Sequence, residues 1–185
     1  MTRWVVLAAY AGLGAVLVSV VGAAWRSGRD VIGRAPIHPL ALVVGKVCLI
    51  AADLALLADV LGLRHGRLAV PAGVYGAGLG VFLAGTALTV AALLRLGART
   101  TVGLAEDART LETGGVYRLG RNPMYLGLYL MAAGGALATL SLVATALTVV
   151  GVAIHHRVVL AEERFLRERL GDAWDRYAAT ARRYL

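Results

Sequence analysis

The sequence predicts an all-α, polytopic membrane protein with about five transmembrane helices and an amphipathic helix at its C-terminus. Of the 185 residues, 59% are hydrophobic and only 16% are charged, whereas soluble domains are nearer about half apolar and a quarter charged. The mean hydropathy is +0.72. The apolar residues form long runs, each close to the roughly 20 residues that a helix needs to cross a bilayer. The arginines lie in the gaps between these runs.

Each of the runs is expected to form one transmembrane helix. The first has Trp4 and Trp25 near its ends, where interfacial anchors are common. The third begins with Pro71, which the first position of a helix tolerates. Only residues 139–141 separate the last two runs, so these should form a tight antiparallel hairpin. The runs are residues 4–25, 40–63, 71–94, 124–140 and 142–160.

The distribution of arginine predicts the orientation in the membrane. With the N-terminus outside, fifteen arginines fall on the opposite side, and only Arg3, Arg64 and Arg67 fall on the outer side. Because basic residues favour the cytoplasm, the loop 95–123 and the tail 161–185 are expected there. The first run is long for a signal peptide, and its removal would invert this topology, so we interpret it as a span.

The tail is expected to be a surface helix rather than a span. Its apolar residues recur at helical spacing among charges, which is typical of an amphipathic helix on the membrane or over the loop. Gly171 is a candidate break in this helix. We expect one integrated domain, in which residues 1–94 form a three-span region and residues 95–185 a C-terminal region. The apolar positions of the tail are Phe165, Leu166, Leu170, Trp174, Tyr177 and Tyr184.

The net charge of +8 does not indicate nucleic-acid binding, because the arginines follow the membrane topology and do not alternate with aromatic residues. Cys48 is the only cysteine and lies in an apolar run, so we expect neither disulfides nor a thiolate metal site. His155 and His156 precede two glutamates, but adjacent residues point to different faces of a helix. We therefore expect no bound metal.

Three ionisable residues lie in the second run. Such groups are costly at membrane depth and are often functional. Lys46 is expected to reach toward the cytoplasmic edge and Asp59 toward the outer edge, which leaves Asp53 near mid-depth. Asp53 is expected to make a polar contact with another helix, with a proton or substrate pathway as the alternative.

The third run contains a GxxxG pattern formed by Gly76 and Gly80, with Gly73 and Gly85 nearby. Small residues allow helices to approach each other closely. We expect this pattern to pack against a neighbouring helix, with formation of a homo-oligomer through the small-residue face as a weaker alternative.

The segment TGGVYRLGRNPMYLG, residues 113–127, is the candidate binding site. Its paired glycines permit a tight turn, and Pro123 marks a helix start whose free N–H groups favour an anion. Arg118 and Arg121 can pair with a carboxylate or phosphate, and Asn122 can donate and accept. Tyr117 and Tyr125 add flat aromatic faces. The segment therefore predicts a site for an anionic, aromatic-bearing small molecule. No GxGxxG follows a strand, which excludes a Rossmann site.

The stretches TLETGGVYRLGRNPMYLG and EERFLRERLGDAWDRYAATARRY together resemble the integral-membrane methyltransferases, which include isoprenylcysteine carboxyl methyltransferases and phospholipid methyltransferases. The usual histidine of that family is Asn122 here, which hydrogen-bonds but does not titrate near neutral pH. The matching positions are Thr113, Gly115, Tyr117, Arg121, Pro123, Tyr125, Gly127, Glu162, Glu163, Leu166, Gly171 and Tyr177.

The resemblance implies S-adenosylmethionine as methyl donor and a lipophilic acceptor that enters from the bilayer through a lateral opening. Arg121 and the helix start suit the donor's carboxylate, and Glu162 or Glu163 suits its amine or ribose hydroxyls. Methyl transfer needs no metal, so catalysis would come from alignment in a dry pocket. The implied donor-binding residues are Tyr117, Arg121, Asn122, Pro123, Tyr125, Gly127, Glu162 and Glu163.

The acceptor is less constrained. We expect O-methylation of an isoprenylcysteine-like carboxylate oriented by Arg157, with N-methylation of a phospholipid or other amine, assisted by Glu163, as the alternative. Small thiols and other lipophilic acceptors also stay open. A reductase of the sterol-reductase type is disfavoured because the chain is short. In a non-enzymatic transporter or assembly protein, Lys46 and Asp53 would be central instead.

Overall fold

The fold is all-α, as predicted. The computed structural model describes residues 2–28, 33–63, 69–97, 104 and 111–184. Four helices in this part of the chain are long and apolar enough to cross a membrane: α1, α2, α3 and α5. The elements in chain order are α1 (Thr2–Arg26), α2 (Pro39–Val60), α3 (Ala72–Leu96), the 3₁₀ helix η2 (Gly115–Arg118), α4 (Pro123–Thr139), α5 (Leu142–Leu170) and α6 (Asp172–Thr180).

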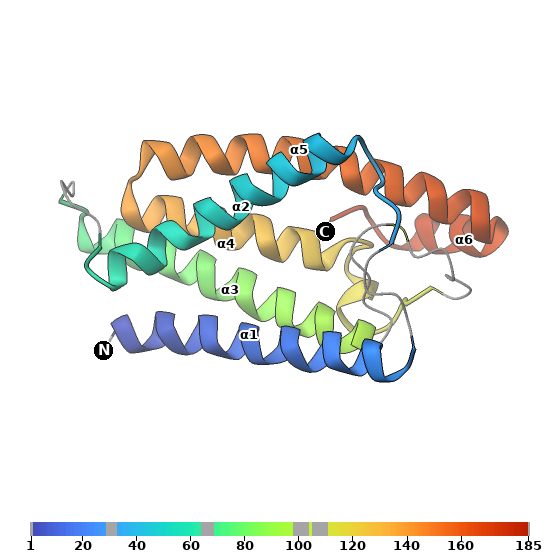
Figure 1. The fold of residues 1–185 in the computed structure, drawn as a ribbon, viewed down its shortest axis with the longest axis horizontal. Helices are drawn as coiled ribbons and strands as arrows, with labels where there is room; N and C mark the ends of the chain where they lie inside the picture. Colours follow the sequence, from blue (N-terminus) through green and yellow to red (C-terminus); the bar gives the residue numbers. More distant parts are fainter. Residues whose placement is uncertain (1, 29–32, 64–68, 98–103, 105–110, 185) are drawn as a thin grey trace.

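Helix α4 lies inside the bundle (Figure 1), where it contacts α2, α3 and α5. Its 17 residues correspond to about 25 Å of helix, which is somewhat less than the roughly 30 Å of a hydrocarbon core. Four of the five predicted spans therefore meet the length criterion, and membrane crossing by α4 stays a prediction. The shared core of the bundle is formed by Val6, Leu56, Phe82, Met131 and Ala138.

Helices α3 and α4 pack backbone to backbone through glycines. A Cβ atom at Gly85 would lie only 2.6 Å from the carbonyl oxygen of Gly127, and one at Gly78 would meet the backbone of Ala138. On the α4 side, a Cβ at Gly134 would meet the backbone of Phe82. The predicted helix contact therefore exists, but it depends on glycines spaced seven residues apart on one face.

The GxxxG pattern itself does not make this contact, which corrects our expectation. Gly73, Gly76 and Gly80 have open space where a Cβ atom would stand, and all three are exposed. Of the four glycines named from the sequence, only Gly85 packs against α4. Gly76 and Gly80 miss this contact because they lie on the opposite side of α3 from residues 78 and 85.

The hairpin between α4 and α5 is as tight as predicted. Leu140 takes the left-handed conformation with φ of 44°. The hydroxyl oxygen of Ser141 then accepts a hydrogen bond from the Ala144 N–H at 3.2 Å, which caps the start of α5.

The tail differs from the prediction of a surface helix that begins at residue 161. Helix α5 continues through residue 170 and extends past the other helices (Figure 1), because nothing interrupts its hydrogen bonding before Gly171. Gly171, with φ of +49°, ends α5 as expected. Helix α6 then turns back, and its Trp174 and Tyr177 pack with Leu111 of the loop. The tail therefore covers the loop.

The glycine contact predicts unequal effects of two equal substitutions in α3. Gly78→Ala should destabilise the protein by about 1–3 kcal/mol, because its methyl group would overlap the α4 backbone. Gly80→Ala, the matched control, should be neutral or stabilising by up to about 1 kcal/mol, because alanine favours a helix. Thermal unfolding in detergent measures both, and equal melting temperatures would contradict the packing described above.

Candidate functional site

The segment before α4 is paired with the end of the tail. The Arg121 N–H donates to the carbonyl oxygen of Arg182 at 2.8 Å, and the Asn122 N–H donates to that of Arg183 at 3.1 Å. A Cβ atom at Gly120 would collide with the Tyr184 carbonyl oxygen. A glycine is therefore required for this close approach, which brings together the two sequence stretches that resemble the membrane methyltransferases.

All three guanidinium nitrogens of Arg121 donate hydrogen bonds within the protein. Its Nε and Nη2 donate to Glu163 at 3.2 and 3.4 Å, and its Nη1 donates to the carbonyl oxygens of Ala178 and Ala181 at 3.0 and 2.6 Å. Its guanidinium carbon lies 5.7 Å from the ring centroid of Trp174. Arg121 thus joins the loop, α5 and the tail.

Glu163 is the acceptor at the centre of the same cluster. Besides Arg121, it accepts from Asn122 Nδ2 at 2.9 Å and from Arg183 Nε at 3.0 Å. Asn122 Nδ2 also donates to the Arg183 carbonyl oxygen at 3.1 Å. An amide nitrogen carries two N–H donors, whereas each histidine nitrogen carries at most one. Asparagine therefore suits this position, and we call these four residues the Glu163 clamp.

Two tyrosines reinforce the clamp from outside the membrane-spanning helices. The Tyr177 hydroxyl donates to the Tyr117 carbonyl oxygen at 2.8 Å. Burial raises the pKa of Tyr177 to about 12, so this donor stays protonated at neutral pH. The Tyr184 hydroxyl lies 2.8 Å from His156 Nδ1, and its ring packs edge-on against that of Tyr129. The tail end is thereby attached to α4 and α5.

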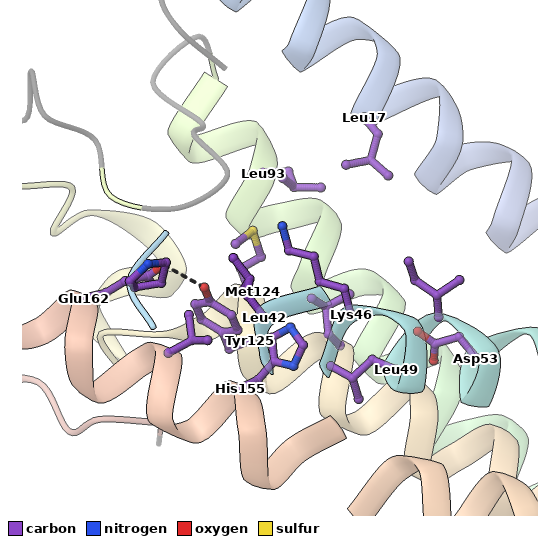
Figure 2. A pocket seen from close by; sticks show the side chains of 14 residues that line it. Leu17, Leu42, Lys46, Leu49, Asp53, Leu93, Met124, Tyr125, His155 and Glu162 are labelled. Carbon is purple, nitrogen blue, oxygen red and sulfur yellow. Dashed lines mark hydrogen bonds between the residues drawn. The ribbon is translucent and has the colours of Figure 1, made fainter. Parts of the chain in front are cut away.

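A cavity of about 380 Å³ lies next to the clamp, within the helix bundle. Its walls are mostly leucines and other apolar side chains, but five polar residues line it as well (Figure 2). Such a volume and composition are typical of small-molecule sites. The polar residues are Lys46, Asp53, Tyr125, His155 and Glu162.

Glu162 and Tyr125 form the clearest polar pair in the cavity. The Tyr125 hydroxyl donates to Glu162 Oε1 at 2.9 Å. Glu162 points into the cavity while its neighbour Glu163 joins the clamp, because consecutive helical residues diverge by about 100°. The acidic pair therefore consists of one residue held by the clamp and one available to a ligand.

His155 is the site residue that the sequence did not identify. It is buried, and its Nδ1 lies 2.9 Å from the Gly151 carbonyl oxygen. Since a carbonyl only accepts, Nδ1 carries a proton, and Nε2 is an acceptor when the ring is neutral. The available signal was its spacing, because His155 precedes Glu162 by seven residues and shares its helix face.

The predicted site residues thus fall into three groups. Tyr125 and Glu162 line the cavity, whereas Arg121, Asn122 and Glu163 form the clamp. The remainder shape the site or lie away from it. Pro123 starts α4, Gly127 packs against Thr89, Tyr117 is buried beneath α6, and Arg157 is exposed and lines neither cavity described here.

A second, polar cavity of about 290 Å³ lies against the outer side of the clamp. Arg121, Glu163 and Arg183 line it together with Arg164 and Arg167 of α5. Since Arg121 and Arg183 already pair with Glu163, this space belongs to the clamp rather than to the apolar cavity.

Comparison with protein families gave one finding. A family model described as phospholipid methyltransferase matches residues 74–173, which is more than half of the chain. The chain therefore belongs to this family. It is a membrane methyltransferase that uses S-adenosylmethionine, and the matched residues include α4, every clamp residue except Arg183, and the whole cavity wall from α5. Comparisons with curated proteins and with solved structures gave no match.

The clamp predicts that two ion-paired arginines, one buried and one exposed, contribute unequally to stability. The side chains of Arg121 and Glu163 are only 12% and 11% exposed, so Arg121→Ala should cost about 3–5 kcal/mol by leaving a buried carboxylate partly unpaired. Arg167→Ala is the matched control, because Arg167 is 65% exposed in its ion pair with Asp175 and should cost at most about 1 kcal/mol. Thermal unfolding of both variants measures the difference, and equal losses would contradict a structural role for the clamp.

Proposed function

We propose that the protein methylates the amine nitrogen of a phospholipid at the membrane interface. The observation that carries this proposal is the Glu162–Tyr125 pair at the polar part of an otherwise apolar cavity. The family's description names phospholipids, which favours amine N-methylation, our alternative from the sequence, over carboxylate O-methylation.

The residues around Glu162 suit S-adenosylmethionine, which combines charged and hydroxyl groups with a flat adenine. One oxygen of the Glu162 carboxylate would bind its ribose hydroxyls, which leaves the other for the acceptor, and Tyr125, Met124 and Leu128 offer apolar surface for the adenine. The Asn122 side chain does not cap α4, so N–H groups of its first turn stay available for the donor's carboxylate. When bound, the donor supplies an electrophilic methyl group on a sulfonium sulfur.

The other expected donor-binding residues support this site indirectly in our proposal. Arg121, Asn122 and Glu163 hold the loop against the tail. Pro123 is the first residue of α4, and Gly127 allows α4 to pack closely against α3. Rigid support of this kind is what alignment of two reactants requires.

An amine acceptor suits the charges of the cavity. An amine must lose a proton to gain a methyl group, and Glu162 is better placed than Glu163 to take it. Glu163 already accepts from three side chains, whereas the one hydrogen bond described for Glu162 comes from Tyr125. Glu162 would also attract an ammonium and repel a carboxylate. Arg157, which was expected to orient a carboxylate, lies on the exposed side of α5.

The acceptor would enter sideways from the bilayer between α1 and α2. Leu17 and Ile50 line the cavity and are nevertheless 41% and 58% exposed, so the cavity wall reaches the lipid-facing surface there. Because α1 and α2 supply this wall while α4 and α5 supply the acidic site, residues 1–94 and 95–185 would act as one unit.

We also propose that the site faces the cytoplasm and the N-terminus lies outside. Helices α1, α3 and α5 end on the same side of the bundle as α6, and these ends carry many of the arginines (Figure 1). Basic residues are retained on the cytoplasmic side. Of the arginines used for this prediction, Arg29, Arg64, Arg67, Arg99 and Arg109 lie outside the described residues.

Incubation with isotope-labelled S-adenosylmethionine and two acceptors tests the reaction. Phosphatidylethanolamine and an isoprenylcysteine-type carboxylate would be offered in the same detergent, followed by mass spectrometry. We expect a label on the phospholipid that survives mild base, because an N-methyl group is stable there. Label released by base as methanol would indicate a carboxyl ester and would overturn N-methylation in favour of O-methylation.

Substitution of the proposed base gives a sharper expectation. Glu162→Gln should lower methyl transfer by about 100-fold or more, because the loss of a positioned base typically costs about 10²–10⁴-fold. Glu168→Gln makes the same change on an exposed position of α5 and should leave transfer unchanged. Full activity of Glu162→Gln, with intact thermal stability, would refute the assignment.

A further inference from the structure

Lys46 is the only lysine of the chain and lines the apolar cavity from α2. All eighteen other basic residues counted in the net charge are arginines. Lys46 lies outside residues 74–173, so the family match assigns it no role.

The ammonium group of Lys46 has no close ion-pair partner among the residues that the structure describes. Among the described residues it makes no hydrogen bond and no ion pair within 4 Å, although its surroundings are Leu42, Leu49 and other apolar side chains. An ammonium without a partner is costly in such surroundings. Its retention there is explained if a ligand supplies the anion.

The neighbours of Lys46 indicate what kind of ligand this is. Figure 2 shows Lys46 between Glu162 and Asp53 in this view, with its ammonium group projecting toward Met124 and Leu93. Lys46 lines the same cavity as Glu162 and His155 of α5. The cavity thus presents a cation and an anion close together, which complements a head group that carries both charges.

Asp53 restricts where the anion can lie. It follows Lys46 by seven residues on the same face of α2, about 10 Å further along the helix. Its Oδ1 is buried and has no hydrogen-bond partner among the described residues. The contact described with another helix, from the Tyr10 hydroxyl, reaches the Asp53 backbone carbonyl. When ionised, this carboxylate would repel a phosphate and favour its binding at the Lys46 end.

We propose that Lys46 binds the phosphate diester of the acceptor lipid while the acceptor's amine lies at Glu162. This inference rests on the function proposed above and names the residue that selects the acceptor. In an ethanolamine phospholipid only two carbons separate the phosphate oxygen from the nitrogen, so both groups fit the same end of the cavity. Lys46 is a specificity residue and takes no part in the chemical step.

A comparison of two acceptors tests this role. Phosphatidylethanolamine and oleylamine both carry a primary amine on an apolar chain, but only the former has a phosphate. Lys46→Met keeps the side-chain length and removes the charge, and should raise KM for phosphatidylethanolamine about 10- to 100-fold. Its kcat/KM for oleylamine should stay at the wild-type value. Lys46→Arg should restore most of the preference, and Arg26→Met, an exposed cation of α1, should behave as wild type.

The outcomes separate this inference from the proposed function. An equal loss with both acceptors, or an unchanged KM for phosphatidylethanolamine, would overturn the role of Lys46 while methyl transfer by the wild type stands. A wild-type protein that transfers methyl to neither amine would overturn the proposed function itself. Calorimetric binding of S-adenosylmethionine to each variant establishes that the donor site is intact.

A measurement on the folded wild-type protein keeps the inference testable if Lys46→Met does not fold. The single lysine permits selective labelling by an amine-reactive acylating reagent, followed by mass spectrometry of the peptide that contains it. Phosphatidylcholine, which has a phosphate but no primary amine, should slow this labelling, and diacylglycerol should not. Equal labelling with both lipids would contradict phosphate binding at Lys46.

Discussion

The ion pair between Arg121 and Glu163 is the interaction on which the geometry of the site depends. Glu163 belongs to α5, Arg121 and Asn122 precede α4, and Arg183 lies in the tail, so one carboxylate joins three segments. The pair is largely buried, and a buried charge is tolerated only when its partners satisfy it. The positions of the loop, the α5 end and the tail are therefore interdependent.

This constraint also determines what the neighbouring glutamate can do. With Glu163 turned toward the clamp, the rotation of the helix carries Glu162 toward the cavity, where Tyr125 holds it. His155, two turns earlier on the same face, is brought to the same wall. The two adjacent glutamates of α5 therefore face different surroundings. Glu163 holds the clamp together, whereas Glu162 faces the cavity in which we propose that methyl transfer takes place.

The sequence predicted the helices better than their contacts. Apolar runs of bilayer length are a strong signal, and so the five expected helices and the α4–α5 hairpin appear within a few residues of their predicted bounds, except that α5 continues ten residues beyond its predicted end. A helix that is apolar on all sides carries no periodic signal for its packing face, so Gly76 and Gly80 were preferred over Gly78. The partners of Arg121 in the tail lie 57 and 60 residues away, and local spacing cannot foresee such contacts.

The two halves of the cavity differ in what they contribute. The α5 wall and the clamp residue Glu163 fall within the residues matched by the family, while Lys46 and Asp53 on α2 do not. None of the clamp contacts described here involves α2. If Lys46 selects the head group as proposed, a change in the charges of α2 would alter the acceptor without disturbing the clamp. On our proposal, donor chemistry and acceptor choice are carried by separate parts of one helix bundle, so acceptor preference can change while the methyl-transfer site stays the same.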